Sequence, residues 1–442
     1  MVTDLAQLVR GGSARDIAAA VEAAVRQGSL APGAVLPSVR RLASALGVSP
    51  PTVAAALSDL RRRGVIVTRE RRRSIVSPRP PVAGAAVEAA LPPGVRDLAR
   101  GNPDPALLPD LGPMLARLRP RAHLYGDEPV DARLVELGRL ELAEAGVSAE
   151  SVCLVSGALD GVERVLAAHL APGDRVLVED PGYLAVFDLV RAMGLSPVPV
   201  AIDAAGPLPD ALDAALRGGA GALVLTPRAQ NPTGAALDPS RVRALRGVLR
   251  RAPDLVLVED DHQGPIAGVP GHTLTHRRRR WAVVRSVAKS LGPDLRLAFV
   301  AGDAETIARV EGRLALGPGW VSHVLQQLVV ELLRSKRIRT LLERAERAYR
   351  DRRHALLDAL AEYGIVATGR SGFNVWVPVP EETAVVGALL HAGWAVAPGA
   401  RYRLQSPPAI RVTCASLAEA DAPRFAADLA RALKPARRSR AA

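Results

Sequence analysis

Short apolar runs alternate with helix-length segments over most of the chain after about residue 95. The five runs that predict strands are Arg175–Val178, Ala222–Leu225, Leu255–Val258, Trp281–Val287 and Leu297–Ala301. Strands separated by helices pair mainly in parallel, because each helix carries the chain back across the sheet. The pattern therefore predicts an α/β fold with a mainly parallel sheet, whose ligands bind beyond the carboxyl ends of the strands.

Three residues with useful chemistry follow predicted strands. Asn231 comes in the loop after the second run, Asp260 closes the third, and Lys289 follows the fourth. An amide, a carboxylate and an amine are therefore expected at the edge of the sheet where ligands bind.

Lysine is rare in this chain, which makes Lys289 conspicuous. Of the 58 basic residues only three are lysines, namely Lys289, Lys336 and Lys434. Arginine replaces lysine wherever a positive charge is enough, but it cannot condense with an aldehyde. Lys336 and Lys434 lie in polar, basic surroundings, whereas Lys289 follows a buried strand. Lys289 is thus the candidate for an amine that reacts with an aldehyde.

The positive charge is concentrated near the N-terminus. A chain of 442 residues with net charge +13 is long enough for two or three domains. Residues 1–80 contain 13 Arg and five acidic residues, which gives +8, so residues 81–442 carry only +5. This distribution suggests a small unit that binds a polyanion, although charge alone is equally consistent with a solvated arginine-rich surface.

The pattern of helix signals in the small unit favours DNA binding. A first amphipathic helix is predicted from Ala14 to about Gln27, Ser38 caps a second and Ser49 a third, and residues 65–76 predict a two-stranded wing with an arginine tip. This layout places the third helix in the major groove of DNA. The order Leu-Pro-Ser-Val-Arg-Arg-Leu-Ala, then Val-Ser-x-x-Thr-Val, resembles the GntR-type winged helix-turn-helix over about 65 residues.

The resemblance implies a set of DNA-contacting residues, with two departures. Pro50 stands where the family usually has arginine after Ser49, and arginines replace the usual glycines at the wing tip. The departures affect which side chains read bases, while DNA remains the expected partner. The expected contacts are Ser38, Arg40, Ser49, Thr52, Arg71, Arg72 and Arg73.

A proline-rich stretch separates the two units. Pro78, Pro80 and Pro81 begin it and Pro92-Pro93-Gly94 end it, a composition typical of a semi-rigid spacer. We therefore expect a DNA-binding domain at 1–77, a linker at 78–95 and a large domain at 96–436.

The large domain contains the groups that a pyridoxal phosphate site requires. Such a site needs an amine for an imine, a carboxylate for the ring nitrogen and a donor for the ring oxygen, which Lys289, Asp260 and Asn231 supply. A helix that begins after Ser156-Gly157 offers free amides to a phosphate. Each residue alone also has a structural explanation, such as a turn, a solvated strand end or a structural cation. The further candidates are Ala158 and Leu159 at that helix start, Ser286 and Arg296 for the phosphate, and Tyr183 for the ring face.

Motif order and spacing across residues 96–435 resemble aminotransferases of fold type I. The matching blocks are Pro-Gly-Asp-x-Val-x-Val-Glu-Asp-Pro-x-Tyr, Asn-Pro-x-Gly, Ser-x-Ala-Lys and an arginine seven residues after that lysine. The resemblance implies that Arg411 holds a substrate carboxylate. It also implies that Tyr125 reaches the phosphate of a neighbouring subunit in a homodimer.

One departure from this family concerns the tyrosine that follows the ring-nitrogen aspartate. Here the stretch is Asp260-Asp261-His262-Gln263, so His262 takes a place where it could donate a similar hydrogen bond, with an ordinary pKa near neutrality. Transamination would then be impaired while imine formation persists. The alternative is that His262 is a bystander at the pocket rim.

The whole chain resembles the MocR subgroup of GntR regulators. This resemblance implies a transcriptional regulator that responds to pyridoxal phosphate, held as an imine on Lys289, and that binds a double-stranded operator as a homodimer. An amino-compound effector would be gripped by Arg411. The alternatives are an active aminotransferase with a DNA-binding module and a scaffold that only dimerises. Enzymatic activity is not the expected role.

Other features restrict the setting. No apolar stretch approaches the roughly 20 residues needed to cross a bilayer, and the N-terminus lacks the layout of a signal peptide. Cys153 and Cys414 are too few and too isolated for a disulfide framework or a thiolate metal site. The basic turn 272–280 is expected to be a solvated loop rather than a second DNA contact or a zinc site. A cytoplasmic protein without metal is therefore expected.

Overall fold

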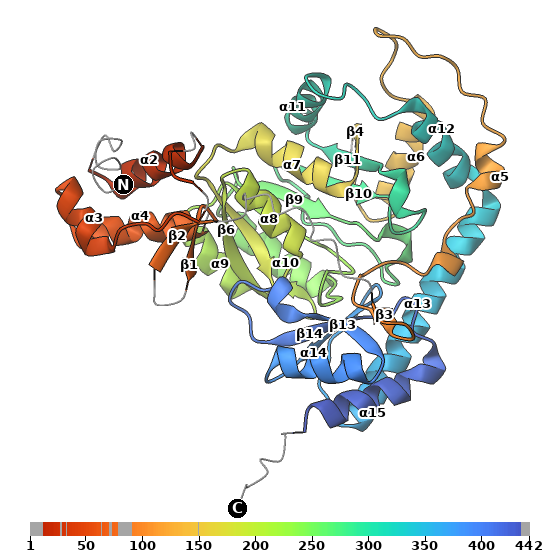
Figure 1. Cartoon of the computed structure of the whole chain (residues 1–442). Coiled ribbons are helices and arrows are strands. Elements are labelled where there is room, and N and C mark those ends of the chain that lie inside the picture. Colours follow the sequence, from red (N-terminus) through yellow and green to blue (C-terminus); the bar gives the residue numbers. More distant parts are fainter. Residues whose placement is uncertain are drawn as a thin grey trace, which may run out of the picture. The chain divides into compact units, whose positions relative to one another are not determined.

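The chain divides near residue 90 into two compact units. The computed structural model (Figure 1) describes residues 12–26, 29–31, 33–62, 64–69, 73–77, 91–148 and 150–434. The predicted linker, 78–95, lies outside the described residues as far as residue 90, and so do Arg71 and Arg72 of the predicted wing tip.

In its described residues, the N-terminal unit contains three helices and a two-stranded antiparallel ribbon, as predicted. Its elements are α2 (Ala14–Arg26), α3 (Val39–Leu46), α4 (Pro50–Arg62), β1 (Ile66–Arg69) and β2 (Arg73–Val76). The helices pack through one apolar face each, with Ile17, Leu42 and Leu60 fully buried. The winged helix-turn-helix fold is therefore confirmed.

Local signals explain where the two central helices begin and end. The Ser38 side chain caps α3 by accepting a hydrogen bond from Arg41 N, and Gly47 ends the helix in the left-handed conformation with φ +64°. At the start of α4, Ser49 Oγ accepts from Thr52 N at 3.3 Å. Gly47, which ends α3, and Ser49, which caps α4, together account for the tight turn between the two helices.

The large unit is built on an eight-stranded sheet in the order β4-β11-β10-β9-β8-β5-β6-β7. The strands are β4 (Ser151–Val155), β5 (Arg175–Asp180), β6 (Ser196–Asp203), β7 (Gly206–Pro207), β8 (Ala222–Leu225), β9 (Val256–Asp260), β10 (Trp281–Ser286) and β11 (Ala298–Gly302). Strands β5, β8, β9 and β10 pair in parallel. All five predicted strands are present, and the mainly parallel sheet is confirmed.

One predicted strand, Leu297–Ala301, runs against the expected direction. It forms β11, which is antiparallel to both β10 and β4. The connection from Ser286 to Ala298 contains only the short 3-10 helix η4 (Pro293–Leu295), too little for the crossover that a parallel return requires. Lys289 lies in this reversing connection.

Helices pack around the larger sheet. Helices α7 and α11 contact strands β4, β10 and β11, and α7 also contacts β9. The helices of this part are α5 (Gly112–Leu115), α6 (Ala132–Ala143), α7 (Ala158–His169), α8 (Leu184–Ala192), α9 (Pro209–Arg217), α10 (Pro239–Leu249), α11 (Ala304–Ala315) and α12 (His323–Arg334), with the 3-10 helices η2 (Pro105–Leu107) and η3 (Gly264–Ile266). Within the described residues, no helix is both long and apolar enough to cross a membrane.

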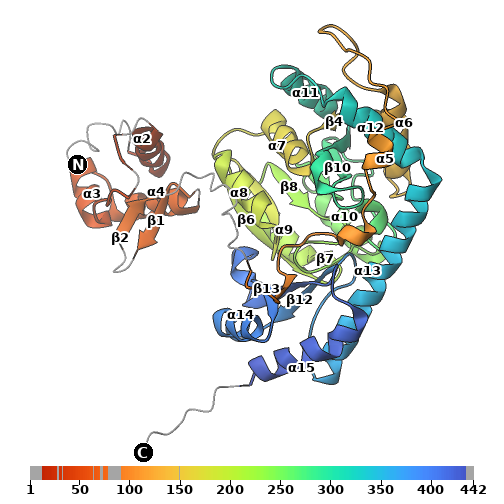
Figure 2. The same ribbon diagram turned by 45° about the vertical axis from the view of Figure 1, so that its right-hand side comes forward.

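A second sheet, which was not predicted, carries Arg411. Its order is β12-β14-β13-β3, and the strands are β3 (Arg96–Leu98), β12 (Asn374–Pro378), β13 (Trp394–Pro398) and β14 (Ala409–Thr413). The long helix α13 (Lys336–Glu362) runs from α12 to α15 (Ala422–Ala432) (Figure 2). Helix α14 (Glu382–His391) and the 3-10 helices η5 (Gly399–Arg401) and η6 (Glu419–Asp421) complete this part.

The basic turn 272–280 has a structural residue at its centre. Arg278 donates to the carbonyl oxygens of Leu249, Ala252 and Leu255 at 2.6–2.8 Å and so holds the segment that follows α10. Arg277 and Arg279 are exposed. The expectation of a solvated loop is therefore wrong for Arg278, because the three carbonyl oxygens between the end of α10 and Leu255 need donors.

Candidate cofactor-binding site

The carboxyl ends of β8, β9 and β10 lie side by side and bring the predicted residues to one edge of the sheet. Asn231 lies in the loop after β8, Asp260 is the last residue of β9, and Lys289 lies three residues beyond β10. Hydrogen bonds and charges connect these residues, as described below. The predicted grouping at the edge of a parallel sheet therefore matches the geometry.

Lys289 is a half-buried amine with one backbone partner. Its Nζ donates to Gly101 O at 2.7 Å and lies 5.9 Å from the ring centroid of Phe373. Burial first, and then the charge of Arg411, lower the pKa of Lys289 to about 8. The neutral, nucleophilic amine is thus far more accessible than in an ordinary lysine.

Asp260 is a buried carboxyl group with an available oxygen. Among the described residues its Oδ1 has no hydrogen-bond partner, and its Oδ2 lies 3.9 Å from His262 Nδ1. Burial and the adjacent charge of Asp261 raise the pKa of Asp260 to about 7. A buried acceptor of this kind is suited to an N–H donor from a ligand.

The next residue, Asp261, has the opposite environment. It accepts two hydrogen bonds from Arg228, both at 3.0 Å, and one from Arg285 at 2.5 Å. Burial alone would raise the pKa of Asp261, but Arg285 and Arg228 outweigh it and hold the pKa at about 2. Asp260 and Asp261 are 5% and 2% exposed, so the alternative of a solvated strand end is wrong.

His262 has a pKa well below the value expected from sequence. Burial first, and then the nearby positive charge of Lys289, lower the pKa of His262 to about 4. The expectation of titration near neutrality is therefore corrected, because both causes disfavour the charged ring. Among the described residues, Nδ1 of His262 has no hydrogen-bond partner, so the neutral ring retains a free polar atom.

Asn231 is held by Arg411, which comes from the second sheet. Arg411 Nη1 donates to Asn231 Oδ1 at 3.0 Å, and the guanidinium lies 4.7 Å from the ring centroid of Tyr402. Arg411 also donates to Ala99 O. A Cβ at Gly101 would lie 3.2 Å from both terminal nitrogens of Arg411, so glycine with φ +67° permits this close approach.

The start of α7 forms a second polar region near the sheet edge. Ala158 and Leu159 are its first two residues, and Arg296 Nη2 donates to Ser156 O at 3.3 Å. A Cβ on Gly157 would lie 2.8 Å from Arg296 Nη2, so the guanidinium closely covers the turn before α7. Free helix amides beside a guanidinium suit an anion.

The remaining predicted ligands differ in position. Ser286 Oγ accepts from Ala288 N at 3.1 Å and is buried. Tyr183 is 39% exposed, and partial desolvation, followed by the charge of Asp260, raises the pKa of its hydroxyl. Tyr125 is 95% exposed and contacts Trp320 edge to face, with ring centroids 5.8 Å apart, so it takes no part in this hydrogen-bonded cluster.

The residues present fit pyridoxal phosphate. Asp260 has a buried oxygen that accepts no hydrogen bond from the described residues and could accept one from the ring nitrogen. Lys289 could supply the amine for the aldehyde. Asn231 and His262 offer polar atoms for the ring oxygen, while Arg296 and the start of α7 offer donors for the phosphate.

Sequence reasoning missed several residues that shape the site. Asp261 was noted only as part of the strand end, and its arginine partners come from 33 and 24 residues away. Gly101 accepts from Lys289 and lies against Arg411. Turn signals around Arg100-Gly101-Asn102-Pro103 could have indicated the turn, but not what it contacts.

The predicted DNA contacts lie on or near α3 and α4 where they are described. Ser38, Arg40 and Ser49 are exposed, and the Ser49 and Thr52 hydroxyls lie 2.7 Å apart. Arg73 is the first residue of β2. Exposed polar groups at the start of the second and third helices are in the position from which such domains contact DNA.

Comparison with known proteins matches each of the two units to a protein family. Residues 123–429 match the aminotransferase class I and II family, and residues 13–76 match bacterial regulatory proteins of the gntR family. The chain is 39% identical over 430 residues to the vitamin B6 salvage pathway transcriptional repressor PtsJ of Salmonella typhimurium, covering 96% of this chain and 100% of that protein. It is 28% identical to the pyridoxine biosynthesis transcriptional regulator PdxR of Corynebacterium glutamicum, over 76% of each chain.

The large unit also resembles a solved aminotransferase structure. The α-aminoadipate aminotransferase LysN of Thermus thermophilus, determined in complex with N-(5'-phosphopyridoxyl)-L-leucine, superposes with a TM-score of 0.68 at 26% identity, covering 77% of this chain and 92% of that one. An aminotransferase domain of this class implies pyridoxal phosphate as its cofactor. The chain belongs to the aminotransferase class I and II family and, with its gntR-type domain, to the MocR-type transcriptional regulators, which bind DNA and carry an aminotransferase-like sensing domain.

Proposed function

We propose that this regulator senses pyridoxal phosphate through Lys289 and changes its operator binding in response. When bound, pyridoxal phosphate supplies an aldehyde carbon and an electron-withdrawing ring. One observation carries the proposal: the same site contains an amine of lowered pKa, Lys289, and a buried carboxyl oxygen, on Asp260, that accepts no hydrogen bond from the described residues. The relatives named for vitamin B6 salvage and pyridoxine biosynthesis support a role in vitamin B6 supply.

Each site residue has a proposed task. Lys289, whose Nζ donates to Gly101 O, would supply the amine that holds the aldehyde carbon, and Asp260 would accept a hydrogen bond from the ring nitrogen. Asn231 and His262 orient the ring oxygen. The phosphate is held by the Ala158 and Leu159 amides with Ser286 and Arg296, and Tyr183 covers the ring face.

Arg411 is proposed to bind the carboxylate of an amino-compound effector. Its guanidinium is 3% exposed and already holds neutral oxygens of Asn231 and Ala99. A carboxylate would compete well for these donors, because charge-assisted hydrogen bonds are stronger than neutral ones. An effector with both an amine and a carboxylate would reach Lys289 and Arg411 together.

The working form is proposed to be a homodimer. Large apolar side chains are exposed on and around α5, α6 and α11, including Leu124 (71%) and Leu316 (91%). We take these exposed apolar side chains as support for an interface, because interfaces bury apolar surface. In the dimer Tyr125, itself 95% exposed, would reach the phosphate held by the partner subunit.

The wider setting follows from the same proposal. The operator is double-stranded DNA, contacted by Ser38, Arg40, Ser49 and Thr52 and by the wing arginines 71–73. The proposed domain boundaries are 1–77, 78–95 and 96–436, and the proposed location is the cytoplasm.

An active aminotransferase is the second candidate function. The Arg411–Asn231 pair favours it, because a carboxylate grip beside Lys289 also serves a substrate. Against it stands His262, whose neutral imidazole occupies the region of the family's tyrosine. Steady turnover of an amino donor and a keto acid would favour the enzyme.

Operator binding is expected to depend on pyridoxal phosphate. Fluorescence anisotropy with a labelled fragment from upstream of the regulated gene should show an affinity that differs by roughly fivefold or more between cofactor-loaded and cofactor-free protein, the range of typical allosteric coupling. A non-operator fragment of equal length is the control. Identical affinity in both states would reject cofactor sensing.

The rate of cofactor attachment is expected to rise only moderately with pH. Condensation requires the neutral amine, and with a pKa of about 8 roughly a tenth of Lys289 is neutral at pH 7 and roughly nine-tenths at pH 9. The visible absorption band should therefore grow about ninefold faster at pH 9. An ordinary lysine amine would give a rise of about 100-fold over this range, so Nα-acetyl-lysine, which keeps its side-chain amine, is a suitable comparison. A flat profile, or one matching Nα-acetyl-lysine, would contradict the expectation.

A further inference from the structure

A short segment at the entrance to the second sheet, residues Arg370, Ser371 and Gly372, lies between two loops of the cofactor site. One loop follows β8 and carries Asn231. The other loop follows Asp260 and leads through His262 into η3. Neither loop belongs to the second sheet, so this 370–372 segment joins three separate parts of the chain.

The Ser371 hydroxyl bonds to both loops. Its Oγ accepts a hydrogen bond from Ala229 N at 3.1 Å and donates one to Ala267 O at 2.8 Å. Ser371 is fully buried. One hydroxyl group therefore joins the backbone two residues before Asn231 to the backbone at the end of η3, five residues after His262.

Backbone contacts fix the 370–372 segment on the same loops. The amides of Arg370 and Ser371 donate to Gly234 O at 3.0 and 2.9 Å, and Gly372 N donates to Ala267 O at 2.8 Å. A Cβ at Gly234 would lie 2.6 Å from Asn374 O, and one at Gly372 would lie 2.6 Å from the Ala229 Cβ. The packing thus leaves no space for either loop to shift independently of the segment.

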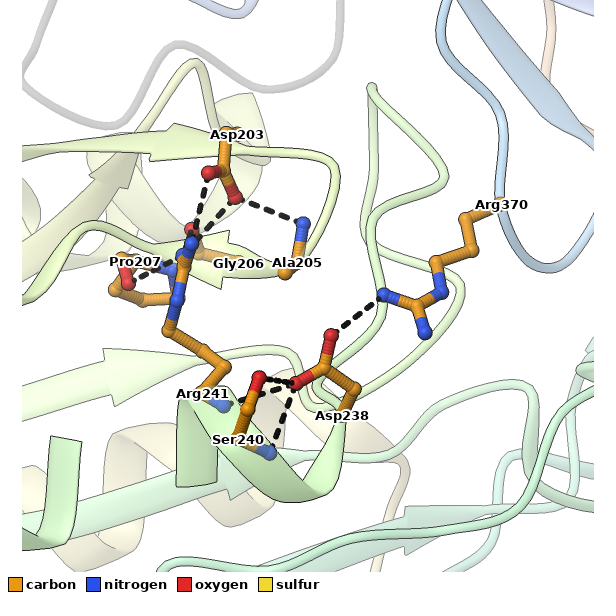
Figure 3. Close-up of polar contacts among 8 residues, drawn as sticks. All are labelled: Asp203, Ala205, Gly206, Pro207, Asp238, Ser240, Arg241 and Arg370. Atoms are coloured by element: carbon orange, nitrogen blue, oxygen red, sulfur yellow. Dashed lines mark hydrogen bonds and ion pairs between the residues drawn. The ribbon is translucent and has the colours of Figure 1, made fainter. Parts of the chain in front are cut away.

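An ion pair at the surface also connects the 370–372 segment to the start of α10. Arg370 Nη1 lies 3.1 Å from Asp238 Oδ2, while Asp238 Oδ1 caps α10 through the amides of Ser240 and Arg241 (Figure 3). Arg241 in turn reaches Asp203 with both terminal nitrogens. Both Arg370 and Asp238 are partly exposed, so the pair orients the segment more than it stabilises it.

The 370–372 segment also leads directly to Arg411. It continues into β12, which pairs with β14 so that Trp376 lies opposite Arg411. Arg411 in turn donates to Asn231 Oδ1, so β14 is also bonded to the loop that carries Asn231. Movement of Arg411 and placement of the ring-binding residues are therefore linked through one short stretch of backbone.

We infer that Ser371 is a positioning residue that holds the Asn231 loop and the Asp260–His262 loop in register around the cofactor ring. It thereby links the strand that carries Arg411 to the residues that contact the ring. The inference rests on the proposed binding of pyridoxal phosphate by Lys289. Ser371 itself touches neither the amine nor the carboxylate in the contacts described above.

Substitution of Ser371 tests this inference. In Ser371→Ala, the amide of Ala229 loses its hydrogen-bond acceptor, while the carbonyl of Ala267 keeps only the hydrogen bond from Gly372 N among those described. We expect the full-length variant to bind pyridoxal phosphate about tenfold more weakly, the size of effect of one broken buried hydrogen-bond pair. The measurements are titration of the visible absorption band and its circular dichroism, which is expected to weaken because the ring is less firmly oriented.

The matched control is Ser335→Ala. The Ser335 hydroxyl accepts from Ile338 N at 3.4 Å and caps α13, so its loss should lower stability without changing cofactor affinity or dichroism. Ser371→Cys keeps a weak donor on a slightly larger side chain, and is expected to fall between the wild type and Ser371→Ala. If Ser371→Ala does not fold, Ser371→Cys decides the question.

The outcomes separate the two proposals. A folded Ser371 variant with wild-type affinity and dichroism would overturn the positioning role while leaving cofactor sensing intact. If the wild-type protein itself develops no band with pyridoxal phosphate, the proposed function fails and the inference fails with it.

Discussion

Lys289→Arg is expected to abolish the visible absorption band that the wild-type protein develops with pyridoxal phosphate. Arginine preserves the positive charge but cannot form a carbon–nitrogen double bond with an aldehyde. In the same variant, the dependence of operator affinity on pyridoxal phosphate should disappear. Absorption spectroscopy and fluorescence anisotropy with operator DNA measure the two effects on one preparation.

The rarity of lysine provides a matched control for this experiment. Lys336 is exposed at the start of α13, so Lys336→Arg should behave as the wild type in both measurements. A retained band in Lys289→Arg would assign the reactive amine to another residue. A lost band with unchanged cofactor-dependent DNA binding would instead separate sensing from covalent attachment.

The parallel core of the fold could be predicted because its strands are buried on both faces. Strands β8, β9 and β10 consist entirely of buried residues, and such strands appear in a sequence as continuous apolar runs. The second sheet contains equally buried strands, such as β14, but no regular alternation with helices indicates how its strands pair. Strand β3 has three residues, and it pairs with β13 almost 300 residues later in the chain, so no local pattern links them.

The site shows the same division between local and long-range information. Residue types at strand ends indicated Lys289, Asp260 and Asn231, because the edge of a parallel sheet is where ligands bind. Sequence could not distinguish the environments of Asp260 and Asp261. The first keeps an unpartnered oxygen, while the second meets Arg228 and Arg285, which lie on other elements.

The same limit applies to His262 and Ser371. The pKa of His262 depends on burial and on Lys289, which is 27 residues away in sequence, so composition gave only the ordinary value. Ser371 lies in a turn whose sequence, Gly-Arg-Ser-Gly, has no distinguishing pattern. Its importance is visible only once Ala229 and Ala267 are known to flank it.

Asp261→Asn is expected to be among the most destabilising single substitutions in the large domain. The carboxylate is 2% exposed and balances Arg228 and Arg285, whose side chains are 10% and 3% exposed. Asparagine removes the negative charge and leaves two buried guanidinium groups. Among the described residues, Glu141, 3.7 Å from Arg285, is the remaining acidic partner of these two arginines. Breaking a buried ion pair in this way costs roughly 3–5 kcal/mol. Urea denaturation of wild type and variant at pH 7 measures the difference.

The control makes the same chemical change in an exposed ion pair. Asp254 and Arg279 lie 3.5 Å apart with side chains 68% and 76% exposed, so Asp254→Asn should change the free energy of unfolding little. In Asp261→Asn, by contrast, Asp260 also loses the neighbouring charge that helps to raise its pKa. Asp260 should then lose its proton at a lower pH. In a folded variant, the Asp260 carboxylate should therefore accept a hydrogen bond from the ring N–H more readily, although the domain is less stable. Equal losses of stability in the two variants would show that Asp261 does not compensate buried charge.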